Sequence, residues 1–375
     1  MLPHSRITLL VLASLLATAP LAAPTIAARV AGAPARGTAT PPPRTEPRAG
    51  NRPQFPPGPS RRFGIEKAPR KAGGAIRLGT YNMLNLFDHV DDPNLSGEFD
   101  DLPMKTSDDR CRAMAKAIRE LDADILAVEE IESLEALTWF RDTYLKDLGY
   151  THVLARDVGY YRGVEQGILS RFPIVEDRIW PEADLRNVTR EGLGWAQPGA
   201  EVKPGERIPF QRSPLMVTVK VRDDYSLTLF AVHHKAGNFD FQREGEALMI
   251  NSIISEIARK DPSRNIAVLG DFNAAPWDKS LRVYLQNGFT DTLAGRTTDN
   301  SNPEALQYRT HESMRVLDYI LLNSAAFREF LPGSAFVLGT LHPGDKYDYK
   351  TDTPPKGYAS DHYPVGVDLV PRDGA

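Results

Sequence analysis

An acid and an amide follow one of the most apolar stretches of the chain. Residues 266–277 read IAVLGDFNAAPW, so Asp271 and Asn273 stand two residues apart, directly after a short apolar run. Such a run is typical of a buried strand, and alternation in an extended chain would place both side chains on the same side. A carboxylate and an amide there can hold and activate an oxygen nucleophile beside a phosphate. An ordinary Asp/Asn turn would give the same pattern, so other parts of the chain must decide.

Acids, amides and histidines recur at the ends of the other expected strands. In chain order the set is Asn82, Glu130, Glu165, His233, Asp271, Asn273, Asp318, Asp361 and His362. Layered folds form sites where strand ends meet at one edge. Cleavage of a phosphodiester needs an activated nucleophile, neutralisation of charge and help for the leaving oxygen, and these side chains can supply all three. The chain has no GxSxG sequence for a serine nucleophile and no Gly-rich phosphate loop.

The elements that must position these residues follow from hydrophobic periodicity. We expect strands at 75–82, 124–131, 151–155, 163–170, 214–221, 226–234, 266–269, 315–322 and 359–370, and helices near 107–121, 133–147, 239–260 and 279–286. Strands come both in helix-separated pairs and as successive hairpins. This predicts an α/β fold in which two mixed sheets pack face to face with helices outside. Most of 172–212 is polar and is predicted to be an inserted surface loop.

The N-terminal region has a composition of its own. Residues 1–23 combine Arg6 with a long apolar run and small residues, the layout of a signal peptide. Residues 24–74 are rich in Pro, Ala, Arg and Gly, which predicts a disordered basic linker before a domain at 75–371. The single cysteine, Cys111, excludes an internal disulfide. Export to the periplasm or the medium is therefore expected.

Charge differs sharply between the two parts of the chain. Residues 1–74 hold 11 Lys and Arg against 2 Asp and Glu, which leaves 34 against 47 in residues 75–375, a net charge of −13. So acidic a body argues against tight, purely electrostatic binding of nucleic acid. It suits a site that gathers cations or uses a metal ion to meet an anionic substrate.

Seven sequence blocks, taken together, resemble one known group of enzymes. In order they are TYNMLNLFD, ILAVEEIE, VEQGILSRFPI, FAVHHKAG, LGDFNAAP, LDYILL and ASDHYPV. Over about residues 76–370 the chain resembles the endonuclease/exonuclease/phosphatase superfamily, which includes deoxyribonucleases, apurinic endonucleases, inositol-polyphosphate phosphatases and bacterial sphingomyelinases. The resemblance implies a four-layer α/β/β/α sandwich like that of deoxyribonuclease I. It also implies a metal-dependent phosphoesterase. Glu129 stands where the family typically has Gln.

The resemblance implies a metal site made of oxygen ligands. Glu130, with Asn82 nearby, would hold a divalent cation, and Asp361 would complete that site or a second one. Carboxylate and amide oxygens without a thiolate suit Mg²⁺, with Mn²⁺ or Ca²⁺ as other candidates.

The resemblance also implies roles for the remaining residues. Asp271 would orient or deprotonate the attacking water, and Asn273 would hold that water or the phosphate. His362, set by Asp318, would contact a phosphate oxygen. By resemblance alone, Glu165 and His233 form a second acid–histidine pair that donates a proton to the leaving group, and Arg212 and Lys235 lie beside the phosphate as fixed positive charges.

Three functions remain open from the sequence. The first is an exported endonuclease or exonuclease acting on DNA or RNA, in which loop aromatics such as Trp180, Trp195, Tyr347, Tyr349 and Tyr358 stack bases. The second is a phosphomonoesterase or a phospholipase C-type hydrolase of a small or lipid phosphate. The third is a catalytically inactive binding module on the same fold. The intact set of acids, amides and histidines favours an enzyme, and no obligate protein partner or transmembrane span after signal removal is implied.

Overall fold

A computed structural model of the chain describes residues 54–90, 105–158, 162–190, 205–296, 302–348 and 351–372. The chain divides into two compact units, Met1–Glu46 and Pro47–Ala375, and every described residue belongs to the second. The signal peptide expected at 1–23 and residues 24–53 of the expected linker lie outside the described residues. No helix within the described ranges is long and apolar enough to cross a membrane.

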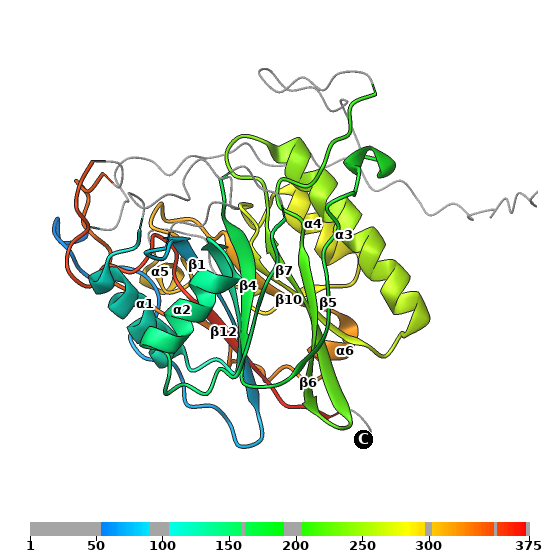
Figure 1. Ribbon diagram of the computed structural model, residues 1–375, viewed down its shortest axis with the longest axis horizontal. Helices are drawn as coiled ribbons and strands as arrows, with labels where there is room; N and C mark the ends of the chain where they lie inside the picture. Colours follow the sequence, from blue (N-terminus) through cyan, green and yellow to red (C-terminus); the bar gives the residue numbers. More distant parts are fainter. Residues whose placement is uncertain are drawn as a thin grey trace, which may run out of the picture. The chain divides into compact units, whose positions relative to one another are not determined.

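Two mixed six-stranded sheets form the centre of this unit (Figure 1). The first sheet, in spatial order, consists of β11 (Phe336–Val337), β12 (Val365–Leu369), β1 (Ile76–Leu86), β2 (Ile125–Ile131), β4 (Glu165–Ser170) and β3 (His152–Ala155). The second, in spatial order, consists of β5 (Ile174–Arg178), β6 (Leu215–Arg222), β7 (Tyr225–His233), β8 (Asn265–Asp271), β10 (Asp318–Leu322) and β9 (Thr290–Asp291).

Helices cover the outer faces of the two sheets. The longer helices are α1 (Asp108–Leu121), α2 (Leu134–Tyr144), α3 (Asp240–Lys260) and α4 (Lys279–Gln286); the shorter ones are η2 (Leu185–Asn187), α5 (Pro303–Leu306) and α6 (Ser324–Phe327). In Figure 1, α1 and α2 lie on one side of the sheets and α3 and α4 on the other. This confirms the predicted four-layer α/β/β/α sandwich.

Three apolar clusters hold these layers together. The first draws side chains from both sheets, for example Leu78 and Leu229, and is the core between them. The second joins the first sheet to α1 and α2, and the third joins the second sheet to α3 and α4. Burial of apolar surface is the main stabilising contribution to such layers, and the central strands are accordingly mostly apolar.

Strand register brings distant polar residues to one edge. In the second sheet, Asp271 at the end of β8 pairs with His233 at the end of β7 and with Asp318 at the start of β10. In the first sheet, Asn82 of β1 pairs with Glu129 of β2. The sheets pack face to face, so these ends meet.

Local sequence explains where the first helices begin. Ser107 caps α1 by accepting a hydrogen bond from the Arg110 backbone N–H, and Ser133 caps α2 by accepting one from Ala136. Two acids, Asp108 and Asp109, occupy the first turn of α1, where the helix dipole favours negative charge. Helix α2 ends at Tyr144, slightly earlier than expected.

The region predicted as a linker up to residue 74 differs from that expectation in its described part. Phe63 is buried in the core between the sheets, and backbone bridges join Ser60 to His342 and Ile65 to Leu338. The packed region therefore begins before residue 75. Composition alone did not reveal this, because isolated apolar residues in a Pro- and Arg-rich stretch carry no periodic pattern.

The predicted surface loop at 172–212 is also more ordered than expected where it is described. It contains β5 and η2, and Leu185 and Phe210 join the core under α3. Trp180 stacks on Phe230, with ring centroids 5.8 Å apart. Trp195 lies outside the described residues.

Candidate active site

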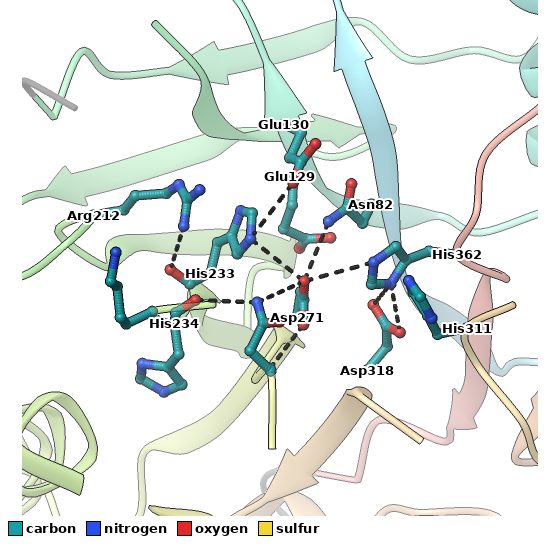
Figure 2. Close-up of polar contacts among 12 residues, drawn as sticks. Asn82, Glu129, Glu130, Arg212, His233, His234, Asp271, His311, Asp318 and His362 are labelled. Carbon is teal, nitrogen blue, oxygen red and sulfur yellow. Dashed lines mark hydrogen bonds and ion pairs between the residues drawn. The ribbon is translucent and has the colours of Figure 1, made fainter. Parts of the chain in front are cut away.

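Asp271 is the centre of the polar cluster at the strand ends (Figure 2). Its Oδ1 accepts a hydrogen bond from the Asn273 backbone N–H at 2.8 Å. Its Oδ2 accepts from the amide Nδ2 of Asn273 at 3.0 Å and of Asn82 at 3.3 Å. The Nε2 atoms of His233 and His362 lie 3.4 and 3.7 Å from the same Oδ2. Two amides and two imidazoles from both sheets therefore converge on one carboxylate oxygen.

The contact between Asn273 and Asp271 has a different cause from the one predicted. Strand β8 ends at Asp271, and Asn273 has a left-handed backbone with φ of 46°, a conformation that Asn tolerates. The chain therefore turns, and the Asp271 side chain bonds the Asn273 backbone as in an Asx turn. The Asp/Asn turn that the sequence left as an alternative therefore exists, and this turn is what brings the Asn273 amide to the Asp271 carboxylate.

Burial sets the proton affinity of Asp271. Loss of water raises the pKa of this carboxyl to about 7, with Asp318 also raising it and the positive charge of His362 opposing the rise. A carboxylate with a pKa near neutrality can take up a proton from water and release it again. This property suits a general base.

His362 is held by Asp318 across the strand ends. Its Nδ1–H donates to both carboxylate oxygens of Asp318, at 2.9 and 3.0 Å, and its backbone N–H donates to Ser360 Oγ. Burial by itself lowers the pKa of His362, but Asp318 and Asp271 together raise it well above the ordinary value. The ring is therefore charged at neutral pH, and its Nε2–H points towards Asp271.

Glu130 projects into the site from a bulge in β2. Its φ is 59°, and the pairing of β2 with β4 shifts register between Glu129 and Ile131, so Glu130 is the extra residue of the strand. Its side chain is 12% exposed, and its Oε1 lies 3.7 Å from His233 Nε2. Burial lowers the pKa of His233 well below the ordinary value, so this ring is neutral and cannot neutralise Glu130.

The residues present fit a divalent cation. Within the described part of the chain, the Glu130 carboxylate makes no hydrogen bond, and Asp361 Oδ1 is a buried oxygen without a partner. A mostly buried carboxylate without a hydrogen-bond donor is costly unless a cation meets it. Asn82 adds an amide beside Asp271. The donor set is oxygen-rich and has no thiolate, which suits a hard divalent ion.

Among the described residues, two groups of three side chains have ligand atoms that all lie within 4.8 Å of one another. One is Asp271, Asp318 and His362, and the other is His311, Asp361 and His362. Asp361 is thus placed beside His362, while Asn82 and Glu130 contact the cluster through Asp271 and His233. No hydrogen bond or ion pair of the described residues joins Asp361 directly to Glu130.

His311 belongs to this site and was not predicted from the sequence. Its Nδ1 accepts the backbone N–H of Ser313 at 3.0 Å, so the ring proton of the neutral form is on Nε2, which lies 3.3 Å from Asp361 Oδ2. Against the effect of burial, His311 and His362 lower the pKa of Asp361 to about 2. His311 lies in a loop with no motif around it, so the sequence offered no signal.

Glu129 takes the place of the Gln typical of the family. It is fully buried, and its Oε1 accepts from the Thr80 hydroxyl at 2.9 Å. Burial and the neighbouring Asp318 raise its pKa well above the ordinary value. The protonated form of Glu129 is therefore favoured, and in that form the side chain is uncharged, as a Gln amide would be.

The other predicted site residues lie in the same region, but not all of them contact the residues around Asp271. Arg212 is buried and its Nη1 lies 3.5 Å from the His233 carbonyl oxygen, whereas Lys235 places its Nζ 4.5 Å from the Phe239 ring centre. Glu165 accepts from the Val158 backbone N–H, and burial raises its pKa to about 8. No hydrogen bond or ion pair joins Glu165 to His233 among the described residues.

Comparisons with known proteins place these observations in a family. The sequence profile of the Endonuclease/Exonuclease/phosphatase family matches residues 79–362. No curated protein sequence matches the chain. Among solved structures, the human Nocturnin catalytic domain is 16% identical, with 80% of this chain and 95% of that chain covered and a TM-score of 0.47. Truncated Caenorhabditis elegans TDP2 is 12% identical, with 79% and 98% covered and the same TM-score.

A third similar structure is the endonuclease/exonuclease/phosphatase from Bacteroides vulgatus, 15% identical, with 79% of this chain and 98% of that chain covered and a TM-score of 0.47. The family profile spans well over half of the chain and includes all of the polar strand ends described above. The chain therefore belongs to the Endonuclease/Exonuclease/phosphatase family, and it is a metal-dependent hydrolase of phosphoric esters.

Proposed function

We propose that this protein hydrolyses phosphodiester bonds of DNA or RNA as an exported endonuclease or exonuclease, with Mg²⁺ as its metal. One observation carries the proposal. Amides of Asn82 and Asn273 and imidazoles of His233 and His362 converge on a single buried oxygen of Asp271. Such an arrangement suits an attacking water and an anionic phosphate bound side by side.

In the proposed mechanism Asp271 is the general base. Its carboxylate, with a pKa of about 7, takes a proton from the attacking water. Asn273 and Asn82 donate to Oδ2 and so fix the direction in which the free lone pair points. Correct orientation of a reacting water is a large part of such catalysis.

Charge on the phosphate is met by His362 and Arg212. The charged His362 ring donates through Nε2 to a phosphate oxygen, while Asp318 holds Nδ1 and keeps the ring in place. Arg212 supplies a fixed positive charge from the side of His233. Lys235 joins it when its side chain leaves the Phe239 ring. Glu165, whose pKa is raised to about 8, can donate a proton towards the leaving oxygen, whereas neutral His233 can offer that oxygen a hydrogen bond only.

Asn82, Glu130 and Asp361 would hold the metal. A divalent cation there supplies charge neutralisation at the phosphate and stabilises the leaving oxygen. Asp361 stays ionised because its pKa is about 2, and Glu130 has a carboxylate without a hydrogen-bond partner in the described chain. Asp361 would therefore meet a cation as a carboxylate, through an Oδ1 that has no hydrogen-bond partner in the described chain.

The loop aromatics give less support to base stacking than the sequence suggested. Trp180 packs on Phe230, and Tyr358 is 2% exposed and packs against Tyr347. Trp195 and Tyr349 lie outside the described residues. The nuclease proposal therefore rests on the phosphate chemistry of the site and not on these rings.

A substrate panel tests the proposal. Purified protein with Mg²⁺ is assayed on plasmid DNA, RNA, bis-p-nitrophenyl phosphate, p-nitrophenyl phosphate and sphingomyelin. We expect cleavage of nucleic acid and of the diester, loss of both activities in EDTA, and recovery with Mg²⁺ or Mn²⁺. Turnover of only the monoester or only the lipid would overturn the nuclease assignment, and full activity in chelator would remove the metal from the mechanism.

Export is part of the same proposal and has its own test. Residues 1–23 have the layout of a cleavable signal peptide. Expressed with its leader in a Gram-negative host, the protein is expected in the periplasm or medium, with a new N-terminus after the apolar run. Intact protein retained in the cytoplasm would contradict this part of the proposal.

A further inference from the structure

Helix α3 buries a carboxylate behind the site, in an unusual place for an acid. Glu246 is 0% exposed although it lies near the start of a helix on the outer layer. Its Oε1 accepts the Gln211 backbone N–H at 2.9 Å and the Gln242 side-chain amide at 3.3 Å. Its Oε2 accepts the Lys235 backbone N–H and the His234 ring Nδ1–H, both at 3.0 Å. One side chain thus satisfies four donors.

These donors require Glu246 to be a carboxylate. Each oxygen accepts two hydrogen bonds, one of them from a backbone N–H, which can only donate. With both lone pairs of each oxygen occupied, no site is left for a proton. Burial acts to raise the pKa of Glu246, but His234 and the two backbone N–H groups hold the pKa below its ordinary value. The negative charge therefore persists deep inside the protein.

Of the two backbone groups bound by Glu246, one belongs to a predicted phosphate-binding cation and the other directly precedes the second cation in the chain. Gln211 directly precedes Arg212, and the second bound N–H is that of Lys235 itself. The Arg212 guanidinium also reaches the carbonyl of His233, next to the bound His234 (Figure 2). The loop before β6 and the end of β7 are far apart in sequence, and Glu246 fixes one against the other.

The same network reaches the loop after Asp271. His234 points away from the site, and its Nε2 lies 3.0 Å from the hydroxyl of Tyr284 on α4. In the tautomer that donates to Glu246 from Nδ1, Nε2 accepts from that hydroxyl. The His234 carbonyl accepts the side-chain amide of Asn273 at 3.1 Å. A chain of hydrogen bonds therefore runs from Glu246 through His234 to the residue that orients Asp271.

We propose that Glu246 is a positioning residue for phosphate binding, which holds Arg212 and Lys235 at the distance from each other that a substrate phosphate requires. This inference rests on the proposed function, because it takes these two cations as phosphate ligands. Asn82, Glu130 and Asp361 would hold the metal, and no hydrogen bond or ion pair of the described residues joins Glu246 to any of them. Loss of Glu246 should therefore affect anion binding and leave cation binding intact.

The variant Glu246→Gln tests this inference with little change in shape. An amide can accept on one oxygen only, and its NH₂ group faces donors, so one of the two backbone N–H groups loses its acceptor. We expect binding of inorganic phosphate, measured by calorimetry in the presence of Mn²⁺, to weaken by roughly tenfold or more, a size typical of residues that orient a binding group. Mn²⁺ affinity without phosphate should stay within about twofold of the wild type. With bis-p-nitrophenyl phosphate, KM should rise more than kcat falls.

Two further variants separate positioning from simple stabilisation. Glu256→Gln changes an exposed acid on the same helix and is expected to leave all three measurements unchanged. Tyr284→Phe removes only the hydroxyl that faces His234, so it should weaken phosphate binding less than Glu246→Gln does, again without change in Mn²⁺ affinity. This second variant keeps the inference testable if Glu246→Gln does not fold.

The outcomes are distinct. Weaker phosphate binding with preserved Mn²⁺ binding supports the inference. Equal loss of both affinities in folded Glu246→Gln, or no loss of phosphate affinity, overturns it and makes Glu246 a structural residue only. If Glu246→Gln does not fold, unchanged phosphate binding by Tyr284→Phe overturns it. Wild-type protein that binds Mn²⁺ but neither binds phosphate nor cleaves the diester overturns the proposed function itself, and the inference with it.

Discussion

At the scale of the residue, Glu129 shows how a buried carboxylic acid can occupy a position where the family has an amide. Its carboxyl lies fully inside the protein, bonded by the Thr80 hydroxyl and close to the charges of Asp318 and Asp271. Each of these acids makes a second negative charge unfavourable, and loss of water does the same. A protonated Glu carries the same number of heavy atoms as Gln and no charge, so it can stand where the family has an amide.

Glu129→Gln should therefore preserve the fold and the turnover of diester substrate. Because its pKa is raised in the folded state, the folded wild type binds more protons than the unfolded chain above the ordinary Glu pKa, and its stability falls as pH rises above about 4.5. The variant has no ionisable group at this position, so its stability does not fall with pH for this reason. Urea unfolding in EDTA across pH 4–9 should show the variant gaining stability relative to wild type as pH rises.

Glu135→Gln on the exposed face of α2 is the matched control and should show no such trend. A variant that lost activity, or whose stability relative to wild type did not change with pH, would mean that Glu129 is ionised in the folded protein.

At the scale of the element, the end of β8 depends on a glycine. Gly270 has φ of +134°, and a Cβ added there would lie 2.0 Å from the Val232 carbonyl oxygen and 3.0 Å from Glu129 Oε1. Strands β7 and β8 therefore approach each other more closely than any side chain permits, directly before Asp271. Only glycine, which has no Cβ, permits the two backbones to approach so closely.

Gly270→Ala is expected to destabilise the fold by roughly 3 kcal/mol or more, because it combines backbone strain with a collision against backbone. Gly288→Ala is the control, since Gly288 also has a positive φ, +87°, but open space around its Cβ position; it should cost about 1 kcal/mol. Equal unfolding free energies for the two variants would show that the close contact with Val232 is absent.

The longer strands and helices followed from sequence because their signal is periodic, but β5, β9 and β11 and the local turns that shape the site did not. Residues 279–286 form α4 as expected, whereas the bulge at Glu130 arises from a single left-handed residue inside an apolar strand. The periodicity of ILAVEEIE does not mark Glu130 as the bulged residue, which only the family resemblance singled out as a metal ligand. His311 and Glu246 were missed for a related reason, because their roles come from contacts between segments far apart in the chain.

At the scale of the whole molecule, the segment before β1 is part of the domain. Phe63 is 1% exposed in the core between the sheets and packs against Phe55 and Tyr363, with ring centroids 5.6 and 5.7 Å away. Its neighbours Ser60 and Ile65 form backbone bridges to the segment that follows β11. The segment thus closes one end of the sheet packing.

Removal of residues 1–53 should leave the unfolding free energy unchanged, since every contact described here remains. Removal of residues 1–74, or the single change Phe63→Ala, should lower it by roughly 3–5 kcal/mol, the usual cost of deleting a buried Phe. Phe327→Ala, at a side chain 38% exposed, is the control and should cost far less. Equal stability of the two truncated proteins would show that residues 54–74 are a linker after all.

Hydrolysis at this site requires Asp271 and His362 to act together on a phosphodiester, and one assay tests this most directly. Initial rates of bis-p-nitrophenyl phosphate hydrolysis with saturating Mg²⁺ are measured for the wild type, Asp271→Asn, His362→Ala and the exposed control Asp223→Asn, after circular dichroism has shown that each is folded. We expect kcat to fall by about 10³-fold or more for the first two variants and to stay unchanged for the control. Near-wild-type turnover by folded Asp271→Asn or His362→Ala would contradict the assignment of this site.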